Sequence, residues 1–218
     1  MSKGLEILTA LKKEIKGLKI VEKRGSTFMR FISWLPPFLF FRKRFMEGYI
    51  TTIGTTIYWP DRPEDFDGDE TIKCLLHESV HAADSANPFF ELSYLFPQIL
   101  AVLSVSALSA IWVGVWGLIG LGFLIFLAPW PAPYRVHWEA RACAYESLFN
   151  YINYGYVGGD WIDNKIEDMF ISWDYYKMSW RFNKTRKLLL KYCIKAQGVE
   201  KPELILPAKS EVLNIIRK

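Results

Sequence analysis

The sequence has few of the residues that build disulfide scaffolds or cysteine-rich metal sites. Three cysteines occur among 218 residues, at positions 74, 143 and 193, and no Cys-x-x-Cys pair exists. This scarcity excludes a disulfide-rich scaffold and favours a reducing compartment. Histidine is just as scarce, with three residues, so chemistry that depends on imidazole can involve only a few positions.

Neither sign of charge dominates the chain. The 27 basic and 23 acidic residues leave a net charge of +4, which is too weak to indicate nucleic acid binding. Apolar residues make up 51% and charged residues 23%, as in folded proteins, so disorder through most of the chain is excluded. We find no internal repeat and no secretory signal in residues 1–24, and the length predicts a single domain spanning residues 1–218.

Periodicity predicts a mostly helical protein of the α+β class. The best strand candidate is residues 49–59 (YITTIGTTIYW), which are rich in β-branched and aromatic side chains, and the odd-numbered ones would share one face. The aromatic residues 28–41, interrupted by Pro36 and Pro37, predict a bent apolar segment. Helices are expected at residues 5–15, 70–86, 134–154, 161–180, 183–197 and 210–217.

An HExxH motif lies inside the helix predicted for residues 70–86. His77 and His81 are four residues apart, so their side chains project from the same helix face and can reach one metal ion. Glu78, between them, can accept a proton from a water molecule that a zinc ion activates. Cys74 lies one turn earlier on the same face, where the role of a small buried apolar residue is favoured over that of a ligand.

A catalytic zinc ion needs a third protein ligand. The candidates are His137, Glu139 and Glu146, which all lie in the helix predicted for residues 134–154. Ligand type and helix-face geometry favour Glu139. Glu146, two turns later on the same face, and His137 stay as alternatives.

The two predicted metal-binding helices resemble those of a known class of enzymes. An HExxH helix followed by a second helix with a Glu-Ala-x-Ala sequence, here residues 139–142, resembles the gluzincin class of zinc metallopeptidases. The resemblance implies a zincin-like core in which Zn²⁺ is bound by His77, His81 and Glu139. Glu78 would then be the general base in the hydrolysis of a peptide or protein substrate.

The resemblance leaves several supporting roles open. Many gluzincins have an Asp four residues after the ligand Glu, where this chain has Cys143, so Asp84 or Asp174 is a candidate to support a zinc-bound histidine. A tyrosine of the cluster at residues 172–176 could stabilise the oxyanion. The strand predicted at residues 49–59 precedes the HExxH helix, as does the edge strand that pairs with extended substrate in zincin-like folds.

A long uncharged stretch separates the two predicted metal-binding helices. No charged residue occurs from Leu92 to Ala132, which favours membrane association through residues 92–130. Because both ends of the stretch must meet at one metal ion, we expect an apolar helical hairpin inserted at residues 89–132 and bent near residues 113–117. The lysine-rich N-terminus places the catalytic side in the cytoplasm, and a buried hairpin in a soluble cytoplasmic protein is the alternative.

The sequence therefore predicts a zinc-dependent peptidase in which metal-activated water attacks the peptide carbonyl and Glu78 accepts the proton. One alternative is a catalytically inactive zinc-binding membrane protein, which would bind metal without turning over any peptide. Another is a membrane-active hairpin protein, whose activity would survive the His77→Ala substitution. A di-iron carboxylate bundle is disfavoured because the sequence has no second Glu-x-x-His motif.

Overall fold

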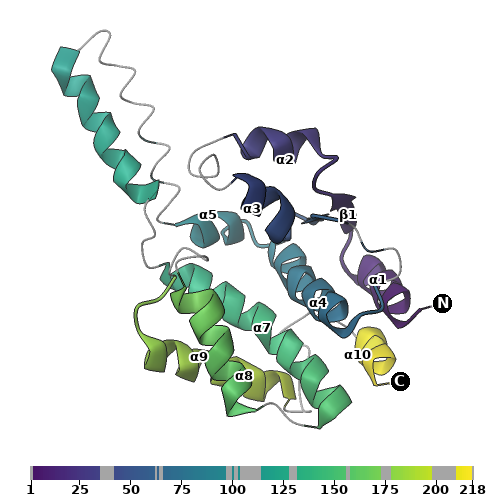
Figure 1. Ribbon diagram of the computed structural model, residues 1–218. Coiled ribbons are helices and arrows are strands. Elements are labelled where there is room, and N and C mark those ends of the chain that lie inside the picture. Colours follow the sequence, from purple (N-terminus) through teal and green to yellow (C-terminus); the bar gives the residue numbers. More distant parts are fainter. Residues whose placement is uncertain are drawn as a thin grey trace.

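The computed structural model describes residues 2–34, 42–61, 63, 66–96, 100, 103, 114–127, 132–155, 158–172, 178–197 and 210–217. Helices account for most of these residues, and a small sheet accompanies them, so the expected α+β, mostly helical class is confirmed (Figure 1). The α-helices are α1 (Lys3–Glu14), α2 (Thr27–Ile32), α3 (Arg42–Gly48), α4 (Asp69–Asp84), α5 (Phe90–Leu95), α7 (Pro133–Tyr154), α8 (Gly159–Lys165), α9 (Phe182–Gln197) and α10 (Ser210–Ile216). The other helical elements are the 3₁₀-helix η3 (Gly114–Leu127) and the π-helical segment η4 (Ile166–Ile171).

The sheet of the described residues has three strands in the order β1-β3-β2. Strand β1 (Lys19–Glu22) is parallel to β3 (Thr56–Trp59), and β2 (Thr51–Ile53) pairs with β3 in the antiparallel direction. The prediction of one strand over residues 49–59 is therefore wrong. A two-residue turn divides this segment, because Gly54 adopts a φ of 55°, which L-residues with a side chain rarely do.

The turn also changes which residues share a face of the sheet. In the antiparallel pair, Thr52 lies opposite Ile57, and residues directly opposite each other point to the same side. Ile57 is buried against the helices, so Thr52 points toward them as well. The prediction that the odd-numbered residues from 49 to 59 share one face is wrong for this reason.

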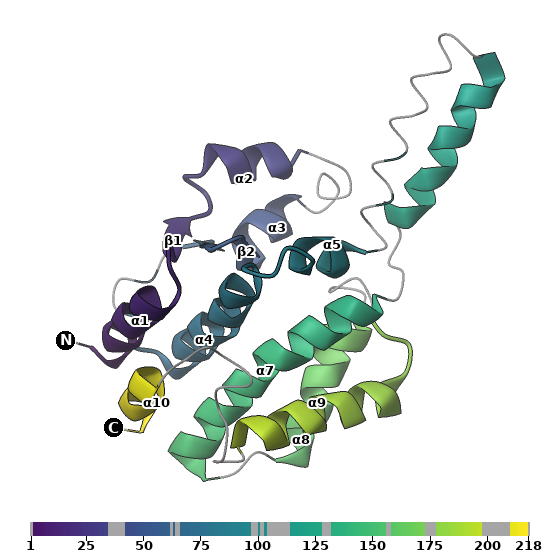
Figure 2. The same cartoon turned by 180° about the vertical axis from the view of Figure 1, so that it is seen from behind.

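Helix α7 lies between α4 on one side and α8 and α9 on the other (Figures 1 and 2). Its side chains enter two apolar cores. Tyr145 and Phe149 pack with residues of α1, α4, α10 and the sheet, whereas Val136 and Cys143 pack with α8, η4 and α9. This double packing fixes α7 against α4, and it thereby sets the position of the acidic side chains of α7 relative to the HExxH motif.

The helix predicted for residues 161–180 ends at Ile171, so the prediction is wrong for residues 172 and 178–180, which the structure describes as non-helical. Helix α8 continues into η4, which ends at Ile171, and residues 173–177 lie outside the described residues. Met178 and Ser179 are not helical, and the backbone N–H of Ser179 donates a hydrogen bond to the carbonyl of Phe170.

The uncharged stretch is described only in part. Residues 97–99, 101–102, 104–113 and 128–131 lie outside the described residues, and with them lies part of the bend predicted near residues 113–117, so the hairpin stays a prediction. Helix η3 extends away from the other helices in both views (Figures 1 and 2). Among the described residues, no helix combines the length and the apolar composition that a bilayer crossing requires.

Candidate metal centre

Helix α4 holds the three residues of the HExxH motif. The helix begins after Gly68 with Asp69 and Glu70 in its first turn, where acidic side chains favour the positive end of the helix dipole. His77 and His81 are both buried, and their ring centroids lie 5.0 Å apart. One helical turn therefore brings the two imidazoles together, as their spacing predicts.

Helix α7 brings Glu139 to the two histidines. Its Oε2 lies 3.2 Å from His77 Nε2 and 3.5 Å from His81 Nε2, and the carboxylate is buried. Ligand atoms that share one tetrahedral ion, with bonds of about 2 Å, lie about 3.3 Å from one another. The three side chains are thus close enough together to hold one metal ion. Two imidazoles and one carboxylate are a donor set that suits zinc, with a fourth position left for water or substrate.

Glu146 contacts His77 Nδ1, whereas Glu139 faces the other ring nitrogen, Nε2. Its Oε1 lies 2.7 Å from His77 Nδ1, and its Oε2 forms an ion pair with Lys165 Nζ at 2.7 Å. A carboxylate in this position accepts the Nδ1 proton, which leaves Nε2 free to bind a metal. This is the supporting role that the sequence left open between Asp84 and Asp174.

The other candidates for ligand and supporting roles lie apart from these groups. The His137 ring is hydrogen-bonded to the hydroxyl of Tyr192 at 2.9 Å, and Asp174 lies outside the described residues. Asp84 forms an ion pair with Arg141 at 2.9 Å. Within the described part of the chain, the buried Nδ1 of His81 has no hydrogen-bond partner, so Asp84 does not support this ring in the way that Glu146 supports His77.

A second group of possible ligands surrounds His77 Nδ1 and includes Cys143 and Glu146. Burial raises the pKa of the Cys143 thiol, so the sulfur stays protonated and is a poor ligand. The ammonium of Lys165 already supplies the positive charge that Glu146 needs. Burial also raises the pKa of Cys74 to about 11, which agrees with a packing role for that thiol.

The charges at the centre make metal binding dependent on pH. Burial alone would raise the pKa of the Glu139 carboxyl, but the neighbouring His81 and His77 rings hold it well below its usual range. For His77, burial lowers the pKa, but this effect is outweighed by hydrogen bonds with Cys143, Glu139 and Glu146. The net result is a pKa well above the usual value for histidine. A metal ion must therefore displace a proton from His77, so metal affinity should rise with pH.

Glu78 points toward the sheet and is held there by a strand residue. The hydroxyl of Thr52 in β2 donates a 2.6 Å hydrogen bond to Glu78 Oε2. Next to it, the fully buried Lys23 donates hydrogen bonds to the carbonyls of Phe45 and Tyr49 and to the Thr51 hydroxyl, at 2.6 to 2.8 Å. These bonds fix the end of α3 and the start of β2. The sequence analysis missed Thr52, although the Gly54 turn would have indicated its face.

Tyr94 of α5 is a second residue that the sequence analysis missed. Its hydroxyl donates a hydrogen bond to Glu139 Oε1, its ring centroid lies 5.6 Å from that of His81, and the Arg135 guanidinium lies 4.9 Å from the ring. Tyr94 therefore orients the carboxylate of Glu139. The tyrosines predicted for the oxyanion, in the cluster at residues 172–176, lie outside the described residues.

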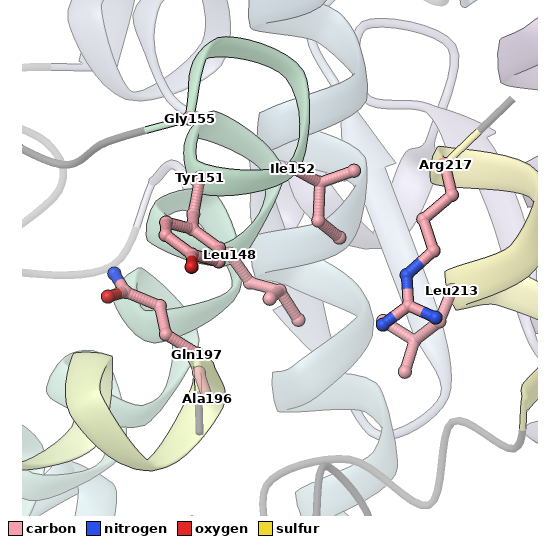
Figure 3. Close-up of a pocket in the computed structure, with 8 residues that line it drawn as sticks. All are labelled: Leu148, Tyr151, Ile152, Gly155, Ala196, Gln197, Leu213 and Arg217. Atoms are coloured by element: carbon pink, nitrogen blue, oxygen red, sulfur yellow. The ribbon is translucent and has the colours of Figure 1, made fainter. Parts of the chain in front are cut away.

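A pocket of about 350 Å³ lies elsewhere, between α7, the end of α9 and α10 (Figure 3). Apolar side chains such as Leu148 and Leu213 line it, together with Gln197 and Arg217. It shares no residue with the metal centre.

The sequence matches no protein-family model, and neither a curated protein nor a solved structure matches the chain.

Proposed function

We propose that this chain is a zinc-dependent peptidase of the gluzincin type. The observation that carries the proposal is the meeting of His77 Nε2, His81 Nε2 and Glu139 Oε2 at separations of 3.2 and 3.5 Å, with Glu78 on the same helix as the two histidines. Zinc hydrolases use this combination, in which three protein ligands leave one position open and an acidic residue lies next to it.

Each residue of the site has a defined task in this proposal. His77, His81 and Glu139 would hold the zinc ion, which when bound would supply a Lewis acid for the substrate carbonyl and a water molecule of lowered pKa. Glu78 accepts the proton of the attacking water and passes it to the leaving amine. Thr52 holds the Glu78 carboxylate in one orientation through its 2.6 Å hydrogen bond.

The finer features of the fold belong to the same proposal. Strand β2 lies at the edge of the described sheet and contacts Glu78 through Thr52, so it is the place where an extended peptide would add to a zincin-like core. The uncharged residues 92–130 would associate with a membrane, with the catalytic side facing the cytoplasm.

Substitution of the general base tests the proposal. In Glu78→Gln, hydrolysis of an unfolded protein substrate should fall by about 10²–10⁴-fold, because the amide cannot accept the proton, while zinc content stays at the wild-type level. Glu70→Gln is the matched control, because Glu70 lies on the same helix but is exposed and forms an ion pair with Lys73, away from the metal centre. A Glu78→Gln protein that keeps both zinc and full activity would contradict the proposal. Zinc in the wild type without turnover would favour an inactive zinc-binding protein.

A further inference from the structure

Helix α2 leaves its largest side chains in solvent. Phe28, Phe31 and Trp34 are 49%, 63% and 58% exposed, and only Met29 of the helix is buried. The three aromatic residues are spaced three apart, so they form one stripe along the helix and its C-terminal end. A helix of a soluble domain normally turns such a stripe toward its core, so this stripe calls for an explanation.

Basic side chains accompany the aromatic stripe. Residues 25–60 contain four basic residues, Arg30, Arg42, Lys43 and Arg44, and one acidic residue, Glu47, although the whole chain has a net charge of only +4. The Arg42 guanidinium lies 4.2 Å from the ring of Trp34, and Arg30 is exposed within the stripe's own helix. Aromatic and basic residues together are typical of segments that lie in the interfacial region of an anionic bilayer.

Helix α5 adds a second exposed apolar face at the same end of the molecule. Its inner face carries Phe90 and Tyr94, which pack against His81. Its outer face and flanking residues leave four large apolar side chains exposed, namely Phe89, Leu92, Leu95 and Phe96. Helices α2, α3 and α5 all lie on the side of the body from which η3 extends, as both views show (Figures 1 and 2).

We propose that the exposed aromatic stripe of α2, the basic side chains of α2 and α3, and the outer face of α5 dock onto the surface of an anionic lipid bilayer. A second copy of the chain fits this surface less well. A symmetric dimer would bring the two basic patches together, and like charges repel. Anionic headgroups complement the basic residues, and the acyl region below them accepts the aromatic side chains. Bilayer docking requires no zinc chemistry, so it can be tested separately from the peptidase activity.

Vesicle flotation of the full chain tests this surface. The vesicles contain phosphatidylcholine with about 30% phosphatidylserine, or phosphatidylcholine alone, because anionic lipid supplies the attraction for basic residues. The test variant is Phe31→Ser/Trp34→Ser. The matched control is Trp180→Ser/Ile194→Ser, since these residues are similarly exposed, at 61% and 65%, but lie outside the proposed surface. Circular dichroism checks that both variants are folded.

The wild type and the control should float with the anionic vesicles, and the test variant should bind about tenfold more weakly for each aromatic residue removed. Binding should also weaken with phosphatidylcholine alone and with added salt, which screens the basic residues. Equal binding by both variants would overturn the proposal, because the uncharged stretch would then carry the binding. The proposal would also be overturned if the wild type did not bind vesicles. The same holds if the wild type formed dimers that the test variant disrupts.

Discussion

The Glu146→Gln substitution tests whether Glu146 orients the His77 ring so that its Nε2 atom can bind a metal ion. The Glu146 carboxylate accepts a 2.7 Å hydrogen bond from His77 Nδ1, and both side chains are buried. The amide of Gln has almost the same shape but no charge, so it keeps the space filled and weakens the bond. Outer partners of metal-bound histidines are worth about 10–100-fold in metal affinity, or roughly 1.4–2.7 kcal/mol.

Lys165 adds a second effect to the same substitution. Its ammonium pairs with Glu146 at 2.7 Å, and its side chain is only 25% exposed, so it would be left without its carboxylate. We expect a loss of about 2 kcal/mol in the free energy of unfolding, between the values for exposed and buried ion pairs. The loss of metal affinity and the loss of stability are measured separately.

Competition titration with a zinc chelator measures the affinity of the folded protein. Glu146→Gln should bind zinc 10–100-fold more weakly than the wild type, within the range for such partners. Glu167→Gln is the control. It makes the same Glu-to-Gln change at an exposed residue of η4. Wild-type zinc affinity in the folded Glu146→Gln protein would refute the reasoning that Glu146 orients His77.

Three further substitutions test other parts of the structure. Thr52→Val should lower peptide turnover about tenfold with zinc content unchanged, because Glu78 loses a charge-assisted hydrogen bond; unchanged turnover would contradict this. Burial lowers the pKa of Lys23 from 10.5 to about 7, so above pH 7 the unfolded chain binds more protons than the folded one and stability rises with pH. From pH 7 to pH 9, urea unfolding should show the wild type gaining about 2 kcal/mol relative to Lys23→Met, and a constant difference would contradict the lowered pKa. Gly4→Ala should lower the unfolding free energy by about 1–3 kcal/mol, because its Cβ would lie 2.0 Å from the Phe66 carbonyl oxygen; wild-type stability would show that the backbone relaxes freely.

Local signals in the sequence were sufficient for the two helices that carry the site. Helix α4 spans Asp69–Asp84, where residues 70–86 were predicted, because acidic residues begin it and Asn87-Pro88 follow it. Helix α7 spans Pro133–Tyr154 and ends at Gly155 in the left-handed conformation, which favours glycine. Both ends depend on residues next to them in the chain, so they can be read from the sequence.

Contacts between distant segments could not be predicted in the same way. Glu139 and Glu146 lie two turns apart on α7, and the packing of α7 against α4 decides which nitrogen of His77 each one meets. The hydrogen bond between Tyr94 and Glu139 depends on the direction in which α5 leaves α4. Gly54 was a local signal for the β-hairpin that the strand prediction overlooked, and with it the face of Thr52.

Metal content of the purified chain, compared with that of Glu139→Ala, tests the central claim most directly. The wild type should contain about one zinc per chain, since the three buried side chains that could bind the ion would leave one open position, as in catalytic zinc sites. Glu139→Ala should lose the zinc or bind it far more weakly while remaining folded. A wild-type protein without metal, or zinc binding that is unaffected by Glu139→Ala, would contradict the three-ligand centre.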